Sequence, residues 1–206
     1  MYMLAGGYFR RFLGLSCLVF VGAAVLVLCH DHVEASSAQS EVKNIEAHDT
    51  GSKMVAYIKQ ERYDEAIQVG MDWLQDHPGD DFVHQEIANV YLIRAQKENP
   101  SQREQWVAKA IFYSDKAANL HSKNKDVAGV QLFQVARGFE AAGDLSTTEK
   151  CSCYARARKL LQEREPSLQG DQITLDGRTY KLAPLRKENE KILAEVTEKA
   201  TKAGCK

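Results

Sequence analysis

Cysteine is the residue type in this chain with the clearest capacity for chemistry. Five cysteines occur in 206 residues, and Cys151, Cys153 and Cys205 lie in its polar C-terminal part. On a helix, Cys151 and Cys153 would point about 200° apart, so they should not bond to each other. Either could reach Cys205 if a C-terminal helix packed back against theirs, and that disulfide would add roughly 2–4 kcal/mol of stability. The third thiol would then be free or intermolecular. Alternatively, all three are small buried residues.

Other side chains give little indication of catalysis or metal binding. The "CHDH" run at 29–32 has metal-capable side chains, but it borders an apolar segment, where polar residues are expected anyway. The sequence contains no glycine-rich phosphate loop, no zinc-finger cysteine spacing and no nucleophile elbow. We therefore expect no catalytic residue, no cofactor and no metal site. The six histidines are scattered: His30, His32, His48, His77, His84 and His121.

The composition predicts a folded, mainly helical protein that does not bind nucleic acid. The formal net charge is −1, from 27 Lys and Arg against 28 Asp and Glu, and the two signs are interspersed. A general nucleic-acid surface needs a concentrated basic face instead. A hydrophobic content of 44% with four prolines fits a folded helical chain rather than a disordered one.

The N-terminal segment has the length and polarity of a membrane span. Arg10 and Arg11 precede eighteen uncharged, mostly apolar residues at 12–29. As a helix, these residues would cover roughly 27 Å, close to the hydrocarbon thickness of a bilayer. The run exceeds the apolar core of about 7–15 residues in a cleaved signal. We expect a transmembrane anchor, with a cleaved signal sequence as the alternative because the small residues Ala35 and Ala38 follow.

The flanking charges predict the orientation of this span. Two arginines precede it, whereas no Lys or Arg follows until Lys43. The positive-inside rule therefore places residues 1–11 in the cytoplasm and the rest of the chain on the far side of the membrane. Residues 30–51 are polar and are expected to form a tether. The chain would be a single-pass membrane protein with an extracytoplasmic domain, periplasmic if bacterial, or a secreted protein if the segment is cleaved.

Apolar residues recur at helical spacing after the tether. In "RYDEAIQVGMDWLQDHPGDD" (62–81), Tyr63, Ala66 and Gly70 share one helical face, and "HPGDD" ends the helix. With the preceding "SKMVAYIKQE", this stretch predicts a helical hairpin of about 34 residues. Two more hairpins follow. One combines "FVHQEIANVYLIRA" with "QWVAKAIFYSDKAANLHSKN", and the other combines "VQLFQVARGFEAAGDL" with "CSCYARARKLLQE".

These hairpins, at 52–163, resemble three degenerate repeats of the tetratricopeptide repeat (TPR) family. The family pattern places small residues at the eighth, twentieth and twenty-seventh positions and an aromatic residue at the eleventh. "AAGDL" resembles the family's inter-helix turn, with Gly143 in a slot that needs permissive dihedrals. Met54, Trp73 and Thr148 are larger than the pattern prefers, and the second repeat carries about ten extra residues, "QKENPSQREQ", between its helices. In position order, the pattern falls on Met54, Ala88 and Ala136; Tyr57, Tyr91 and Phe139; Ala66, Ala110 and Thr148; and Trp73, Ala117 and Ala155.

The resemblance implies a concave groove that binds a protein or peptide partner. Groove-facing residues of the family lie on the first helix of each pair. Three repeats give a short groove, with room for a short peptide or one helix. In the second and third repeats the implied groove residues are Phe82, Gln85, Asn89, Leu92, Val130, Phe133, Arg137 and Glu140.

The residues after the repeats predict a small β-hairpin and a terminal helix. Within 164–183, "QITLDGRTYKL" changes the apolar period from 3.6 to 2 around an Asp176–Gly177 turn, which would place Ile173 opposite Tyr180. Residues 184–206 form an amphipathic pattern typical of a helix. This helix would cap the open end of the solenoid or pair with a partner.

Together these patterns predict a mostly all-α fold, a TPR-like α-solenoid of about three helical hairpins with a small C-terminal β-hairpin and a terminal helix. The expected function is that of a membrane-anchored protein–protein interaction scaffold or adaptor, not an enzyme. Its partner would be another envelope protein, reached near the membrane through residues 12–29. The alternative is a secreted TPR protein with a thiol-redox accessory role through Cys151, Cys153 or Cys205.

Overall fold

The computed structural model describes residues 49–121, 129–175 and 178–205. These residues belong to one compact unit, Lys43–Lys206. The span predicted at 12–29 and most of the predicted tether lie outside the described residues. Among those that are described, no helix is both long enough and apolar enough to cross a membrane.

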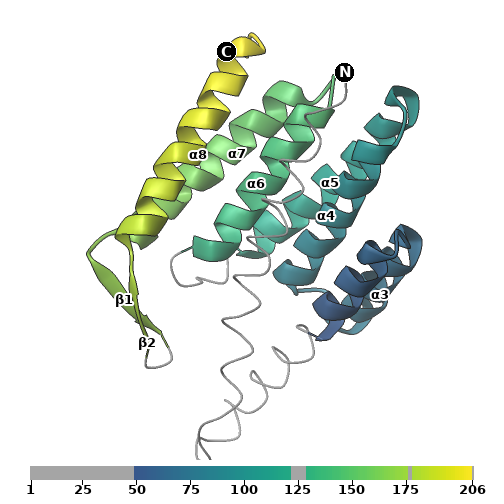
Figure 1. Ribbon diagram of the computed structural model, residues 1–206, viewed down its shortest axis with the longest axis horizontal. Helices are drawn as coiled ribbons and strands as arrows, with labels where there is room; N and C mark the ends of the chain where they lie inside the picture. Colours follow the sequence, from purple (N-terminus) through teal and green to yellow (C-terminus); the bar gives the residue numbers. More distant parts are fainter. Residues whose placement is uncertain (1–48, 122–128, 176–177, 206) are drawn as a thin grey trace, which may run out of the picture. The chain divides into compact units, whose positions relative to one another are not determined.

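The described part of the chain is mainly helical, as predicted (Figure 1). Neighbouring helices pack in chain order, and α4 also contacts α6 across the intervening helix. Residues 49–59 are helical. The elements that follow are α3 (Tyr63–Asp76), α4 (Asp81–Lys97), α5 (Pro100–His121), α6 (Val130–Leu145), α7 (Lys150–Arg164), the 3-10 helix η2 (Glu165–Leu168), β1 (Gln172–Leu175), β2 (Arg178–Lys181) and α8 (Ala183–Lys202).

Local hydrogen bonds explain where several helices begin. The carboxylate of Asp80 accepts a hydrogen bond of 3.0 Å from the backbone N–H of Val83, which caps α4. Ser146 Oγ accepts the N–H of Glu149 at 2.8 Å just before α7. Asp80 thus satisfies an amide that α4 leaves without a partner in its first turn, and Ser146 satisfies the amide of the residue just before α7. Polar residues at the turns therefore determine how the helices are divided.

Six of the eight pattern positions in the first two hairpins are buried, whereas Tyr57 and Trp73 of the first hairpin are half-buried. Ala66, Ala88 and Ala110 are fully inaccessible, and Tyr91 is 7% exposed. The third hairpin departs from the predicted alignment. Thr148 precedes α7 and is exposed, as is Ala155, whereas the small residues Cys153 and Ala157 are buried. The residues of α7 that face the core thus differ from those that the repeat pattern selects.

Gly143 does not occupy a turn, contrary to the sequence-based expectation. Helix α6 continues to Leu145, and the backbone at Gly143 is helical. A Cβ atom at this position would come within 2.7 Å of the Tyr154 ring on α7. The residue is therefore needed for close packing of two helices, not for an unusual dihedral angle.

The predicted β-hairpin is confirmed. Strands β1 and β2 are antiparallel, and Ile173 pairs with Tyr180 in the expected register; the Asp176–Gly177 turn lies outside the described residues. Leu168 and Leu182 form a small apolar cluster of their own beneath the hairpin. The Arg186 guanidinium donates to the carbonyl oxygen of Leu168 at 2.9 Å, which fixes the base of the hairpin to α8.

Helix α8 packs against α7 (Figure 1). It buries Ile192, Val196 and Ala200. Its C-terminus is closed by Gly204, whose φ of 72° lies in the left-handed region that favours glycine. The backbone N–H of Cys205 then reaches the carbonyl of Ala200 at 2.9 Å, a Schellman-type closure. This turn directs Cys205 back toward α7.

Candidate partner-binding site

The eight predicted groove residues all lie on α4 and α6, which are adjacent helices. A Cβ on Gly138 of α6 would lie within 2.7 Å of the Gln85 amide of α4, so the two backbones approach closely. Four of the eight side chains are buried and cannot meet a partner directly. Their exposed fractions are 1% for Gln85, 3% for Leu92, 4% for Phe133 and 3% for Glu140.

The other four side chains remain accessible to different degrees. Val130 is 38% exposed, and Phe82, Asn89 and Arg137 are half-buried. Phe82 and Asn89 lie seven residues apart and share one side of α4, and Val130 and Arg137 are related in the same way on α6. We call these four residues the α4/α6 face.

Two buried polar residues hold the accessible polar residues of this face. Gln85 Nε2 donates a hydrogen bond of 3.0 Å to Asn89 Oδ1. The Glu140 carboxylate accepts from the guanidinium of Arg137. Because each support is itself buried, Asn89 and Arg137 are restrained in orientation before any partner arrives.

Glu86 belongs to the same hydrogen-bonded chain but was not predicted from the sequence. Its carboxylate accepts from Asn89 Nδ2 at 3.4 Å. Burial raises the pKa of Glu86 to about 7, while the hydrogen bond from Asn89 acts in the opposite direction. The spacing of three residues from Asn89 on one helix was the only sequence signal that could have identified it.

A charged cluster connects α6 to α8 behind Arg137. Lys199 Nζ lies 2.7 Å from Glu140 Oε1 and 2.6 Å from Asp144 Oδ2. Burial opposes the charged form of Lys199, but hydrogen bonds to Asp144 and Glu140 outweigh it, and the pKa of Lys199 is raised. Tyr154 of α7 donates to Asp144 Oδ1 at 2.8 Å. Sequence reasoning missed Lys199 because its partners are more than 50 residues away.

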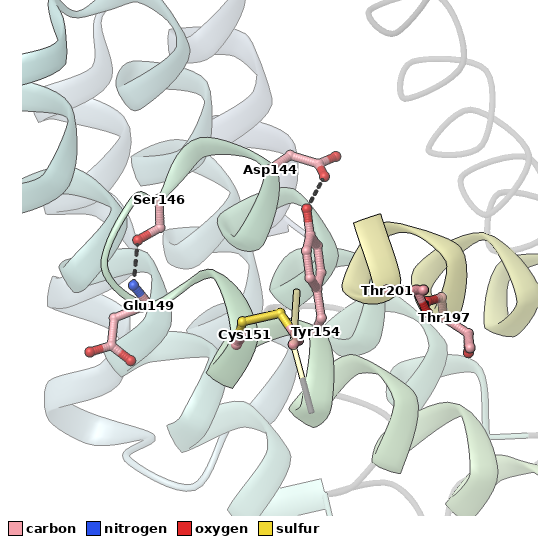
Figure 2. The surroundings of a disulfide bond; sticks show 8 residues. Asp144, Ser146, Glu149, Cys151, Tyr154, Thr197 and Thr201 are labelled. Atoms are coloured by element: carbon pink, nitrogen blue, oxygen red, sulfur yellow. Dashed lines mark hydrogen bonds between the residues drawn. A yellow bond between two sulfur atoms is a disulfide. The ribbon is translucent and has the colours of Figure 1, made fainter. Parts of the chain in front are cut away.

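The structure joins Cys151 to Cys205 in a disulfide and leaves Cys153 as a buried free thiol (Figure 2). Cys151 is exposed in the first turn of α7. Burial raises the pKa of Cys153 to about 12, so almost no thiolate forms there at neutral pH. A thiol in this setting is a poor nucleophile.

Across 49–121, 129–175 and 178–205, no three or more His, Cys, Asp and Glu side chains are grouped so that they could hold a metal ion. The "CHDH" run at 29–32 lies outside these ranges. A scan against models of known protein families and a search of curated proteins found no match to this chain. The resemblance to the TPR family stays a prediction.

Proposed function

We propose that this chain is a membrane-anchored, extracytoplasmic, TPR-like protein that binds a protein or peptide partner as a scaffold or adaptor in a cell-envelope assembly. One observation carries the proposal: the accessible polar residues of the α4/α6 face, Asn89 and Arg137, are each held by a buried polar residue. Side chains restrained in advance lose less conformational entropy on binding, so more of the contact energy becomes affinity.

The chemistry of the α4/α6 face suits a short peptide or a single helix. Phe82 and Val130 offer apolar contact near the N-terminal ends of α4 and α6. The Asn89 amide can both donate and accept, as a peptide backbone requires. Arg137 keeps 25% of its side chain exposed while bound to Glu140, so it can still donate to a partner oxygen. The face would therefore combine an apolar end with a polar end, as peptide grooves do.

The membrane segment predicted at 12–29 would confine the binding domain near other envelope proteins. Confinement raises the effective concentration of a membrane-bound partner, so a short face with modest affinity suffices. If the segment is cleaved as a signal sequence, the same face would act in a secreted protein.

The proposal is tested by photo-crosslinking from Val130 in the full chain, expressed in its native membrane. A crosslinking amino acid at Val130 is expected to capture a discrete partner. Asn89→Ala combined with Arg137→Ala should reduce that capture at least fivefold, since it removes both restrained polar groups.

Two controls make this test specific. A crosslinker at Phe112 of α5, which is 55% exposed, samples an exposed apolar residue outside the α4/α6 face and should not capture the same species. Gln68→Ala with Lys159→Ala removes one amide and one cation from α3 and α7, and it should leave capture unchanged. Equal capture from Phe112, or full capture by the Asn89/Arg137 variant, would contradict the proposal.

A further inference from the structure

The Cys151–Cys205 disulfide lies at the junction of the two helices that close the C-terminal end of the domain. It links the first turn of α7 to the residue that follows the Schellman-type turn of α8, with Cα atoms 5.3 Å apart and a sequence separation of 54. Figure 2 shows Tyr154 extending from the same part of α7 toward Asp144, beside the end of α8. The bond therefore restrains the part of α8 that carries Lys199.

Lys199 transmits the position of α8 to α6. Its ammonium group lies between Glu140 and Asp144, at 2.7 and 2.6 Å, and its side chain is 25% exposed. Lys199 lies six residues before Cys205, less than two helical turns away. Loosening the C-terminal end of α8 would thus move this cation before it disturbs the apolar contacts at Ile192 and Val196.

Glu140 connects the position of Lys199 to the position of Arg137, because its carboxylate contacts both side chains. This carboxylate is 3% exposed and is shared by two cations, Lys199 of α8 and Arg137 of its own helix. A buried carboxylate that loses one cationic partner interacts more strongly with the one that remains, because an unpaired buried charge is costly. Arg137 already donates to Glu140 Oε2, and Lys199 occupies Oε1. Once Lys199 leaves, a second N–H of Arg137 can bond to Oε1, so the guanidinium becomes bidentate and presents fewer donors to a partner.

We infer that the Cys151–Cys205 disulfide is a redox-sensitive latch on the α4/α6 face, which keeps Arg137 available to a partner when oxidised and withdraws it when reduced. This inference rests on the proposed function of that face. The relay runs from the disulfide through the end of α8 and Lys199 to Glu140 and Arg137.

The chemistry requires a dithiol reductant. One of its thiolates attacks Sγ of Cys151, an exposed residue, the S–S bond breaks, and Cys205 leaves as a thiolate that takes a proton from water. The second thiol of the reductant, as thiolate, resolves the mixed disulfide and releases Cys151, so two electrons pass to the protein and the reductant becomes a disulfide. The N-terminus of α7 favours Cys151 as the departing thiolate in this second step. Cys153 takes no part because it is buried.

The test uses residue-specific labelling of the full chain, with and without dithiothreitol, read by mass spectrometry. Reduction is expected to raise amine labelling of Lys199 at least threefold and to lower phenylglyoxal labelling of Arg137 by a similar factor. Lys191 on the same helix, 63% exposed, is the control for general changes in reactivity and should not respond. If reduction leaves the labelling of either Lys199 or Arg137 unchanged, the latch is overturned.

Two variants separate the relay from simple unfolding. Lys199→Met in the oxidised chain removes the cation with the disulfide intact, and it should lower Arg137 labelling as reduction does; no change there contradicts the relay. In the Cys151→Ser/Cys205→Ser chain, Cys153 should stay unreactive to iodoacetamide while Lys199 labelling rises. Rapid alkylation of Cys153 would instead show that loss of the disulfide unfolds the domain, which overturns the latch.

The latch and the proposed function can fail separately. If the labels respond as expected but capture from Val130 is the same in both redox states, Arg137 does not bind the partner, and the proposed role of the face is wrong while the latch stands. If the labels do not respond but capture depends on Asn89 and Arg137, the face stands and the latch is wrong.

Discussion

Gly143 shows how much a single absent side chain contributes to this fold. The Tyr154 ring occupies the space beside it and is fixed by a hydrogen bond of 2.8 Å to Asp144. An aromatic ring held in this way cannot move aside as the end of a flexible chain could. The position is therefore closed to any larger residue.

Gly143→Ala is expected to lower the free energy of unfolding by about 1–2 kcal/mol, because overpacking against Tyr154 outweighs the gain in helix propensity. Chemical denaturation of the purified chain measures the change. Gly79→Ala is the matched control, since nothing lies within 4 Å of its Cβ position, and it should be close to neutral. A Gly143→Ala variant as stable as wild type would show that Tyr154 can shift.

Glu86 makes stability depend on pH. Burial raises its pKa in the folded chain to about 7 from an ordinary value of 4.5. Its stabilising contribution is therefore fully present below the unfolded pKa and is lost as pH rises through about 7. Above pH 7, the Glu86 carboxylate is charged in the folded chain although it is partly desolvated, and this lowers the free energy of unfolding.

Glu86→Gln should accordingly stabilise the chain at pH 8, by on the order of 1 kcal/mol after allowance for solvent screening. The gain over wild type should shrink as the pH is lowered toward 5. Denaturation at a series of pH values measures the difference, with Glu190→Gln, an exposed residue of α8, as control. A gain that is the same at every pH would contradict the assignment to Glu86.

At the residue scale, the sequence identified which cysteines could pair but not which pair forms, since the choice depends on how α8 approaches α7. The resemblance to the repeat pattern also predicted Asn89 and Arg137 as groove residues. Local spacing could not reveal that Gln85 and Glu140 would be buried beneath them. Lys199 had no local signal, because its partners on α6 become neighbours only after packing.

At the scale of elements, one side chain of α5 holds the connection between α6 and α7. Glu104 accepts hydrogen bonds from Ser146 Oγ at 3.0 Å and from Thr147 Oγ1 at 2.6 Å. Hydrogen bonds from Thr147, the largest cause, lower the pKa of Glu104, with Ser146 adding to them against the effect of burial. The second hairpin is thereby tied to the turn of the third.

Glu104→Ala should destabilise the chain by about 1 kcal/mol near neutral pH, because it removes charge-assisted hydrogen bonds that are partly open to solvent. Since the folded pKa is lowered, this contribution is present above the unfolded pKa and disappears as pH falls through the folded value. Thermal unfolding of the variant at pH 7 and pH 3 measures both effects. Gln105 is the exposed neighbour of Glu104, and Gln105→Ala should have little effect on stability. An equal loss of stability in both variants would contradict a stabilising role for the Glu104 hydrogen bonds.

Most element positions followed from periodicity and turn chemistry, but residues 100–105, expected to lie between the helices of the second hairpin, belong to α5. Helix faces followed less well. Asp-Gly between two β-forming runs was enough to place Ile173 opposite Tyr180. For α7, the repeat pattern selected Thr148 and Ala155, and both are exposed. The helix begins only at Lys150, so the spacing carried over from earlier repeats no longer matches the face that meets α6.

At the scale of the whole molecule, the N-terminal segment is predicted to determine where the domain works. The full chain is expected to stay with membranes through carbonate extraction at alkaline pH, because the eighteen uncharged, mostly apolar residues at 12–29 would hold it in the bilayer. Deleting residues 12–29 should move it to the soluble fraction. Release of the full chain by carbonate would contradict an anchor, and a mature N-terminus beyond residue 29 would point to a cleaved signal.

The disulfide also changes what a protease can do to this protein. Its two ends enclose α7 from Cys151 onward, η2, the β-hairpin and the whole of α8 within one covalent ring. A single cut anywhere between Cys151 and Cys205 would leave the two fragments joined, with their total mass increased only by one water. Such a nicked chain would run as one band on a non-reducing gel and as two after reduction. Damage to the hairpin would thus go unseen until the bond is broken.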